Sequence, residues 1–150
     1  MPAELRGPPK VLAAPDGFRF TDSRRGFVSL INLASVRDLE SRLGVPVDPL
    51  RFRGNLLVDD LPAWGEFGLL GGELGTPSGL RLKVTKRIER CAATNVDPAT
   101  GLRDLQIPKA LMQLYGHVDC GVYAEVVSSG ALAPGDRFEA EASFQAALPF

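Results

Sequence analysis

Residues 86–104 read KRIERCAATNVDPATGLRD, and a single cysteine in this stretch, Cys91, stands where a strand-like run gives way to a turn. Apolar residues alternate with charged or polar ones over Leu80–Ile88, which predicts a half-buried strand that ends just before the cysteine. The segment Asp97–Gly101 is typical of a tight turn, because proline presets its own backbone angle and glycine permits a left-handed exit. We therefore expect an ordered loop that presents Cys91 at a strand end.

The residues before Cys91 predict a reactive thiol. They include the bases Lys86, Arg87 and Arg90. A cationic neighbourhood lowers the pKa of a thiol, and the thiolate is the form that attacks electrophiles or binds soft metals. Cys120 receives the opposite interpretation, because it begins a predicted core strand over Cys120–Val127 and a free cysteine is among the most buried residue types. A resolving thiol for Cys91 is its alternative role.

Length and composition favour one β-rich domain. The chain has 150 residues with 16 glycines and 12 prolines, which is typical of many turns and short strands. We expect an extended lead-in over residues 1–25 and a single domain over residues 26–150. The predicted fold class is an all-β barrel, closed or nearly closed, with about six or seven strands and two short helices, since closure removes exposed sheet edges.

The two helices have recognisable ends. Ser35, three residues before Asp38, indicates a capping box, so the first helix is predicted over Ser35–Leu43. The second is predicted over Pro108–Tyr115, because proline is tolerated in a first turn and Gly116 suits the position after the last turn.

Composition also argues against several partners. A net charge of −1 gives no global field that would attract nucleic acid or an anionic membrane. The longest apolar runs fall well short of the roughly 20 residues that cross a bilayer, and the N-terminus lacks the apolar core of a signal peptide, so we expect a cytoplasmic chain. Two cysteines and one histidine cannot supply the usual four ligands of structural zinc.

A strand is also predicted over Leu50–Val58. Strand alternation would place Arg51, Arg53 and Asn55 on one face and bury Phe52 on the other. Two arginines on one face suit bidentate binding of phosphate or carboxylate, although a solvated charge pair is the alternative. We expect Arg53 and Asn55 to face the same pocket as Cys91.

Three stretches follow one another in a recognisable order. The first is Arg51–Asp59, which begins Arg-Phe-Arg-Gly-Asn. The second consists of Arg90-Cys91, Thr94, Val96-Asp97-Pro98, Thr100-Gly101 and Arg103-Asp104, and the third consists of Gly121–Ala124 and Pro134–Asp136. Together they resemble the MOSC family, the C-terminal domain type of molybdenum cofactor sulfurases. The first is similar to the family's Arg-Phe-Arg-Pro-Asn element with Gly54 in place of proline, the second to its central motif and the third to its C-terminal strands.

The resemblance implies a MOSC-like β-barrel that binds a molybdenum cofactor of the molybdopterin type. Cys91 would be the central residue, either as a persulfide carrier or as a molybdenum ligand. The candidate cofactor-binding residues are Ser35, Arg51, Arg53, Asn55, Thr94 and Asp97. Ser35 could equally be only a helix cap, and Asp97 only a turn residue.

The resemblance leaves several roles open. As an enzyme, the chain would transfer sulfur to the metal or reduce N-hydroxylated compounds with molybdenum. The alternative is a non-catalytic binding or carrier module that acts with a desulfurase or redox partner. Two features favour that alternative: residues 1–25 are too few to form the small β-rich domain that precedes this point in larger MOSC reductases, and Gly54 makes its strand less rigid than proline would.

Overall fold

The computed structural model describes residues 27–140. Within this part of the chain a six-stranded sheet in the order β2-β1-β5-β4-β3-β6 curves into a half-barrel, and only the β1–β2 pair is parallel. The strands are β1 Val28–Asn32, β2 Leu56–Val58, β3 Glu73–Gly75, β4 Arg81–Glu89, β5 Asp119–Ser128 and β6 Glu139–Ala140. This confirms the predicted β-rich fold class, while the lead-in expected over residues 1–25 lies outside the described residues.

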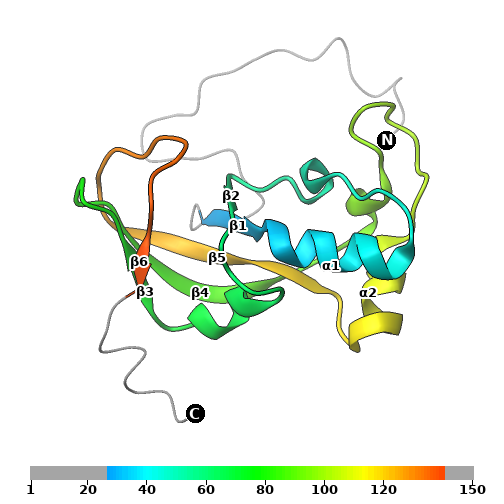
Figure 1. Cartoon of the computed structure of the whole chain (residues 1–150), viewed down its shortest axis with the longest axis horizontal. Helices are drawn as coiled ribbons and strands as arrows, with labels where there is room; N and C mark the ends of the chain where they lie inside the picture. Colours follow the sequence, from blue (N-terminus) through cyan, green and yellow to red (C-terminus); the bar gives the residue numbers. More distant parts are fainter. Residues whose placement is uncertain (1–26, 141–150) are drawn as a thin grey trace, which may run out of the picture.

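Two α-helices accompany the sheet, as predicted. They are α1 Leu33–Leu43 and α2 Ile107–Tyr115, and three short 3-10 helices are η2 Pro49–Phe52, η3 Gly65–Leu69 and η4 Ala92–Asn95. Figure 1 shows α1 and α2 gathered toward one end of the sheet, with β3 and β6 at the other end. No helix within residues 27–140 has the length and hydrophobicity needed to cross a bilayer.

The buried apolar residues form two clusters, one beside the helices and one on the sheet. The helix cluster comprises Ile31, Val36, Leu39, Val47, Phe52, Ile107, Ala110, Leu111 and Cys120. The sheet cluster comprises Leu30, Leu74, Leu80, Leu82, Val84, Val122 and Ala124. Strand β1 serves both clusters, because its consecutive residues Leu30 and Ile31 point to opposite faces.

Strand β5 also changes cluster, at Gly121. Cys120 belongs to the helix cluster and Val122 to the sheet cluster, although residues two apart share a face in a regular strand. Gly121 has a φ of 84°, and a Cβ there would lie 2.7 Å from the Leu30 carbonyl oxygen. The glycine therefore interrupts the alternation at a point where the backbone of β1 leaves no room for a side chain on β5.

Helix α1 begins two residues before its predicted start. Its N-cap is Asn32, whose side-chain oxygen accepts a hydrogen bond from Ala34 N at 3.1 Å. Asparagine is a strong N-cap, and it places Ser35 inside the first turn with a fully buried side chain. The predicted capping box at Ser35 is therefore wrong. The end of α2 is as predicted, since the amide of Gly116, with a φ of 77°, donates to Met112 O.

The first half of the strand predicted over Leu50–Val58 is wrong. Asp48 caps η2 by accepting a hydrogen bond from Leu50 N at 2.9 Å, and a proline follows at the first helical position. These two signals begin a 3-10 helix instead of a strand. Arg53 then adopts a left-handed conformation with a φ of 50°, so Arg51, Arg53 and Asn55 do not share a strand face. Phe52 is only 1% exposed, as predicted.

Candidate functional site

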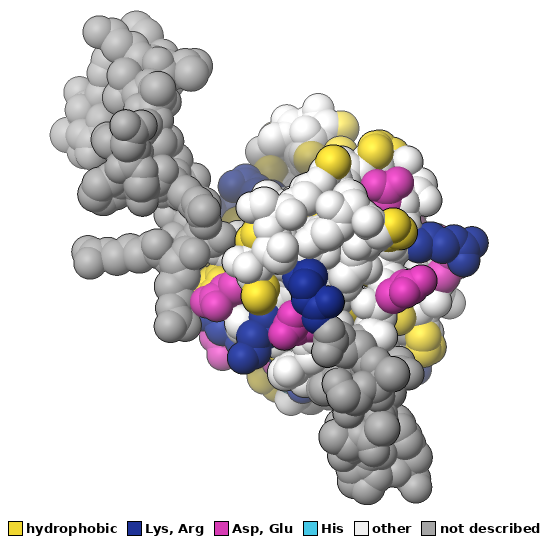
Figure 2. Space-filling model, turned by 90° about the vertical axis from the view of Figure 1, so that its left-hand side faces the viewer, with side chains coloured by type: hydrophobic (Ala, Val, Ile, Leu, Met, Phe, Trp, Pro, Cys, Tyr) yellow, Lys and Arg dark blue, Asp and Glu magenta, His cyan; other side chains and the backbone are white. Residues whose placement is uncertain are grey.

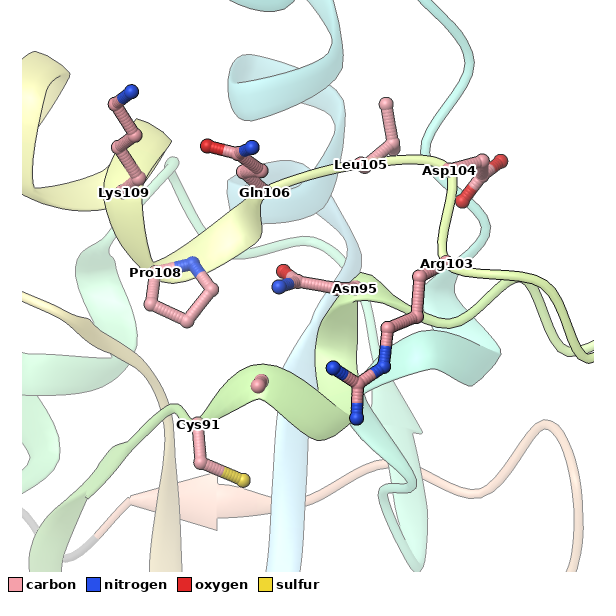
Figure 3. A pocket seen from close by; sticks show the side chains of 9 residues that line it. Cys91, Asn95, Arg103, Asp104, Leu105, Gln106, Pro108 and Lys109 are labelled. Carbon is pink, nitrogen blue, oxygen red and sulfur yellow. The ribbon is translucent and has the colours of Figure 1, made fainter.

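Cys91 opens onto a pocket of about 560 Å³ at the helix end of the sheet. The pocket is formed by the residues after β4, by η4, by the loop that follows it and by the first turn of α2. Its lining residues are Cys91, Ala92, Asn95, Arg103, Asp104, Leu105, Gln106, Pro108 and Lys109. In Figure 3 the Arg103 side chain extends toward the side of the pocket where Cys91 lies, and Lys109 extends away from it.

The backbone around Cys91 is fixed by Thr94. Cys91 is the residue before η4, and its carbonyl oxygen accepts hydrogen bonds from Thr94 N at 3.1 Å and from Thr94 Oγ1 at 2.8 Å. Thr94 is 3% exposed and does not line the pocket, so its hydroxyl holds the loop. The thiol of Cys91 is exposed and free. An accessible thiol is what either proposed role of Cys91 requires.

The basic residues before Cys91 point to other parts of the molecule. Lys86 lies over the rings of Phe27 and Tyr123. Arg87 Nε is 2.9 Å from a carboxylate oxygen of Asp119. None of these five residues lines the pocket, so the expected cationic neighbourhood of the thiol is not supplied by Lys86 or Arg87.

Arg90 faces the interior and holds two backbones together. Its Nε donates to Cys120 O at 2.8 Å and its Nη1 donates to Phe52 O at 2.9 Å. Burial lowers the pKa of this guanidinium, and nearby acidic groups, Cys120 first among them, oppose the shift. Arg90 therefore anchors the end of β4 to β5 and η2. The segment that follows, residues 91–104, is called the Cys91 loop below.

The buried side chain of Arg51 supports the Cys91 loop from the protein interior. Both oxygens of Asp104 accept from its Nη2, at 2.7 and 2.8 Å, and its Nη1 donates to the carbonyl oxygens of Thr94 and Asn95 at 3.4 and 3.2 Å. The Arg51 side chain is 4% exposed. Because its terminal nitrogens are bonded to protein oxygens and it does not line the pocket, Arg51 positions the pocket wall.

Asn95 joins the two halves of the pocket, and no sequence motif singled it out. Its side-chain oxygen accepts from Ile107 N at 2.7 Å and so caps the start of α2. Its backbone oxygen accepts from the amides of Asp104 and Leu105 at 3.1 and 3.4 Å. These contacts leave the Asn95 Nδ2 available in the pocket.

Asp97 has the turn role that was its alternative interpretation. Its Oδ1 accepts from Ala99 N at 2.8 Å, and its carbonyl oxygen accepts from Gly101 N at 2.8 Å. Its own amide donates to Leu102 O at 2.8 Å. Asp97 does not line the pocket, but the turn that it stabilises returns the chain so that Arg103 does.

The three other candidate residues lie outside the pocket lining. The buried Ser35 hydroxyl donates to Glu66 Oε1 at 2.8 Å and accepts from Trp64 N at 2.7 Å. Asn55 Oδ1 accepts from the amide and the hydroxyl of Ser29 at 2.8 and 3.0 Å. Arg53 is exposed at the end of η2. The side chains of Ser35 and Asn55 thus hold neighbouring elements together.

The charges in the pocket come from residues for which the sequence predicts no separate role. Asp104 is the one acidic residue of the lining, and it is bonded to Arg51. Arg103 and Lys109 are exposed, and no hydrogen bond or ion pair joins either side chain to another group within residues 27–140. Gln106 adds a second amide. The pocket therefore combines a thiol, two amides and two unpaired cations.

Comparisons with known proteins agree with this fold. The crystal structure of YiiM from Geobacillus stearothermophilus superposes with a TM-score of 0.58 and 21% sequence identity. The match covers 76% of this chain and 53% of that chain, so it spans about half the length of YiiM. No curated protein sequence matches significantly. The MOSC domain family matches residues 18–139, most of the sequence. The chain therefore belongs to the MOSC domain family, which is generally associated with the molybdenum cofactor.

Proposed function

We propose that the pocket binds a molybdenum cofactor of the molybdopterin type, with Cys91 as the protein's ligand to the metal. The observation that carries this proposal is an exposed thiol on a pocket of about 560 Å³ lined by amides and unpaired cations. Within residues 27–140 no group of three or more His, Cys, Asp or Glu side chains could hold a metal ion. A metal bound here would therefore take one thiolate from the protein and its other ligands from the cofactor.

The residues present fit such a group. Asn95 Nδ2 and the Gln106 amide can hydrogen bond to the polar edge of a pterin, and Arg103 and Lys109 can balance its negative charge. When bound, the cofactor would supply redox chemistry at molybdenum. The protein would hold the thiolate in place through the Thr94 bonds to Cys91 O and support the wall through Arg51.

A second function, sulfur transfer, is favoured by the exposure of the thiol. A carrier cysteine must be reached by the persulfide of a donor protein such as a desulfurase. The Cys91 thiolate would attack the outer sulfur of that persulfide, form a new S–S bond and release the donor's thiolate. Reduction of N-hydroxylated compounds is the corresponding enzymatic role of the metal-bound form.

The test is elemental analysis of protein produced in a host that makes the cofactor, together with cyanolysis of sulfane sulfur. Molybdenum close to one atom per chain in the parent, and its loss in Cys91→Ser, is the expected result. Sulfane sulfur that depends on Cys91, without molybdenum, would identify the carrier instead. The matched control is Cys120→Ala, which should keep whichever group the parent carries because Cys120 does not line the pocket. A parent with neither molybdenum nor sulfane sulfur would overturn both roles.

A further inference from the structure

The pocket around Cys91 has an excess of positive charge. Arg103 and Lys109 line it as cations, whereas the carboxylate of Asp104 is paired with Arg51, whose Nη2 donates to both of its oxygens at 2.7 and 2.8 Å. The whole chain has a formal net charge of −1, so this local excess does not follow from composition. A concave site lined by one sign of charge focuses the field and concentrates ligands of the opposite sign.

The start of α2 adds to this excess. Lys109 lies in the first turn of the helix, and that turn contains no acidic residue. The N-terminus of a helix carries a partial positive charge, so a lysine there is unfavourable unless an anion lies nearby. No carboxylate within residues 27–140 pairs with Lys109. An anionic ligand in the pocket would offset this local repulsion.

The opposite end of the molecule has a different charge distribution. Figure 2 shows the face over the β3 and β6 end, where positive and negative side chains lie side by side among scattered hydrophobic ones. Unpaired bases in that part of the chain, such as Arg137, are not lining residues of the Cys91 pocket. This end of the molecule therefore provides matched control positions.

We propose that Arg103, on the Cys91 side of the pocket, and Lys109, at its rim, form an anion-selecting subsite, so that the ligand or reactant of the thiol carries a phosphate, carboxylate or sulfonate group. The planar guanidinium of Arg103 suits two oxygens of one such group, and the Lys109 ammonium acts as a point charge at the rim. This inference deepens the proposed function, because the subsite lies in the same pocket, and it depends on Cys91 being the reactive group.

The test compares two alkylating reagents that react with the same thiolate. Cys91 displaces iodide from iodoacetate, which is an anion, or from iodoacetamide, which is neutral, and forms a carbon–sulfur bond in both reactions. We take the ratio of the rate constant for iodoacetate to that for iodoacetamide. A change in the thiol pKa alters both rate constants equally, so this ratio isolates the charge preference of the pocket. Peptide mapping confirms that the label is on Cys91.

Removing the pocket cations should lower this ratio. Arg103→Gln should lower it about threefold, as expected for one charge near a protein surface, and Lys109→Gln should lower it less because this side chain extends away from Cys91 in Figure 3. The double variant should show the largest decrease. In the parent, the ratio should fall as ionic strength rises from about 0.01 M to about 1 M, because salt screens exposed charges.

The controls remove the same charges elsewhere. Arg137→Gln and Lys83→Gln change exposed bases that do not line the pocket, and both should keep the parent ratio. An equal ratio in the Arg103→Gln/Lys109→Gln double variant and the Arg137→Gln/Lys83→Gln double control would overturn the subsite. This measurement needs no cofactor, so its outcome is independent of the elemental analysis. If the parent contains no molybdenum and the pocket variants still have a lower ratio than the parent, the subsite is supported and the proposed cofactor is rejected.

Discussion

The Cys91 loop and the interior around Cys120 are neighbouring regions in which the same side chain has opposite properties. Cys91 is exposed and lines the pocket, whereas Cys120 is fully buried in the helix cluster. Arg90 connects the two regions, since it precedes Cys91 in the chain and donates to Cys120 O at 2.8 Å. The two thiols differ in exposure although a single residue, Arg90, connects their surroundings.

The comparison shows that burial outweighs a nearby basic residue in setting the pKa of Cys120. Burial raises the pKa of Cys120 to about 12, Glu66 adds to the increase, and the positive charge of Arg90 only opposes it. A thiolate is poorly stabilised away from water, even with a guanidinium nearby. The bases that precede Cys91 in the sequence are therefore a poor guide to thiol reactivity until the position of each side chain is known.

The largest predicted effect is the difference in labelling between the two cysteines. With a pKa of about 12, only about one Cys120 thiol in ten thousand is ionised at pH 8, and its side chain is also inaccessible. Iodoacetamide at pH 8 should therefore modify Cys91 and leave Cys120 unmodified, as measured by peptide mapping. Cys91→Ser should take up label only after denaturation. Labelling of Cys120 in the folded variant would contradict the comparison.

The same pKa predicts how Cys120 affects stability at alkaline pH. The folded value of about 12 lies above the ordinary value of 9.0, so the unfolded chain loses this proton first as pH rises. The contribution of Cys120 is fully present below pH 9 and is lost as pH rises toward 12. Cys120→Ala should have a smaller alkaline loss of unfolding free energy than the parent.

The next prediction compares the stability that Arg51 gives to the Cys91 loop with the stability that a surface ion pair gives. Arg51→Met removes the bonds to Asp104, Thr94 O and Asn95 O, and should lower the free energy of unfolding by about 2–4 kcal/mol. Amide hydrogen exchange should accelerate over residues 91–104. The control Arg37→Met breaks an exposed pair with Asp59 and should have a much smaller effect on denaturant unfolding. Equal effects would show that Arg51 does not stabilise the loop.

A smaller effect tests the packing of Ile31, which belongs to the helix cluster that contains Cys120. A Cβ on Gly54 would overlap Ile31 Cγ1. Gly54→Ala should therefore lower the unfolding free energy by about 1–3 kcal/mol. In an Ile31→Ala background the same substitution should cost far less, because Cγ1 is gone, and a double-mutant cycle measures the difference. Gly68→Ala, with no atom within 4 Å of the added Cβ, is the control.

The smallest effect concerns His117, between α2 and β5. Its Nδ1 accepts from Asp119 N at 3.0 Å, and it lies among the rings of Trp64, Phe67 and Tyr115. Burial lowers its pKa from the ordinary 6.5, the charge of Arg87 adds to the decrease, and Asp119 opposes it.

The stabilisation by His117 is therefore present above pH 6.5 and is lost as pH falls through the lower folded pKa. His117→Gln should reduce the change in unfolding free energy between pH 7.5 and pH 5.5. An unchanged pH dependence would show that the imidazole does not contribute.

Local patterns were sufficient to predict much of the fold. The alternation over Leu80–Ile88 corresponds to β4 Arg81–Glu89, and Gly116 ends α2 as expected. The burial of Cys120 and the exposure of Cys91 were predicted from a core-strand pattern and a turn pattern. The alternation rule fails before β2 because the helix-start signals Asp48 and Pro49 immediately precede Leu50 and decide the backbone there.

The arrangement of the site was decided by tertiary contacts. Arg51 meets Asp104, 53 residues away, and Asn95 caps a helix that begins 12 residues later. Neither spacing has a sequence signature, because side-chain partners of this kind are set by how loops return over the core. The sequence by itself determined a β-rich MOSC domain with an accessible Cys91. Only the tertiary structure decided that Arg103 and Lys109, rather than Lys86 and Arg87, line its pocket, because an arginine or lysine side chain binds whichever anion or ring the fold brings within its reach.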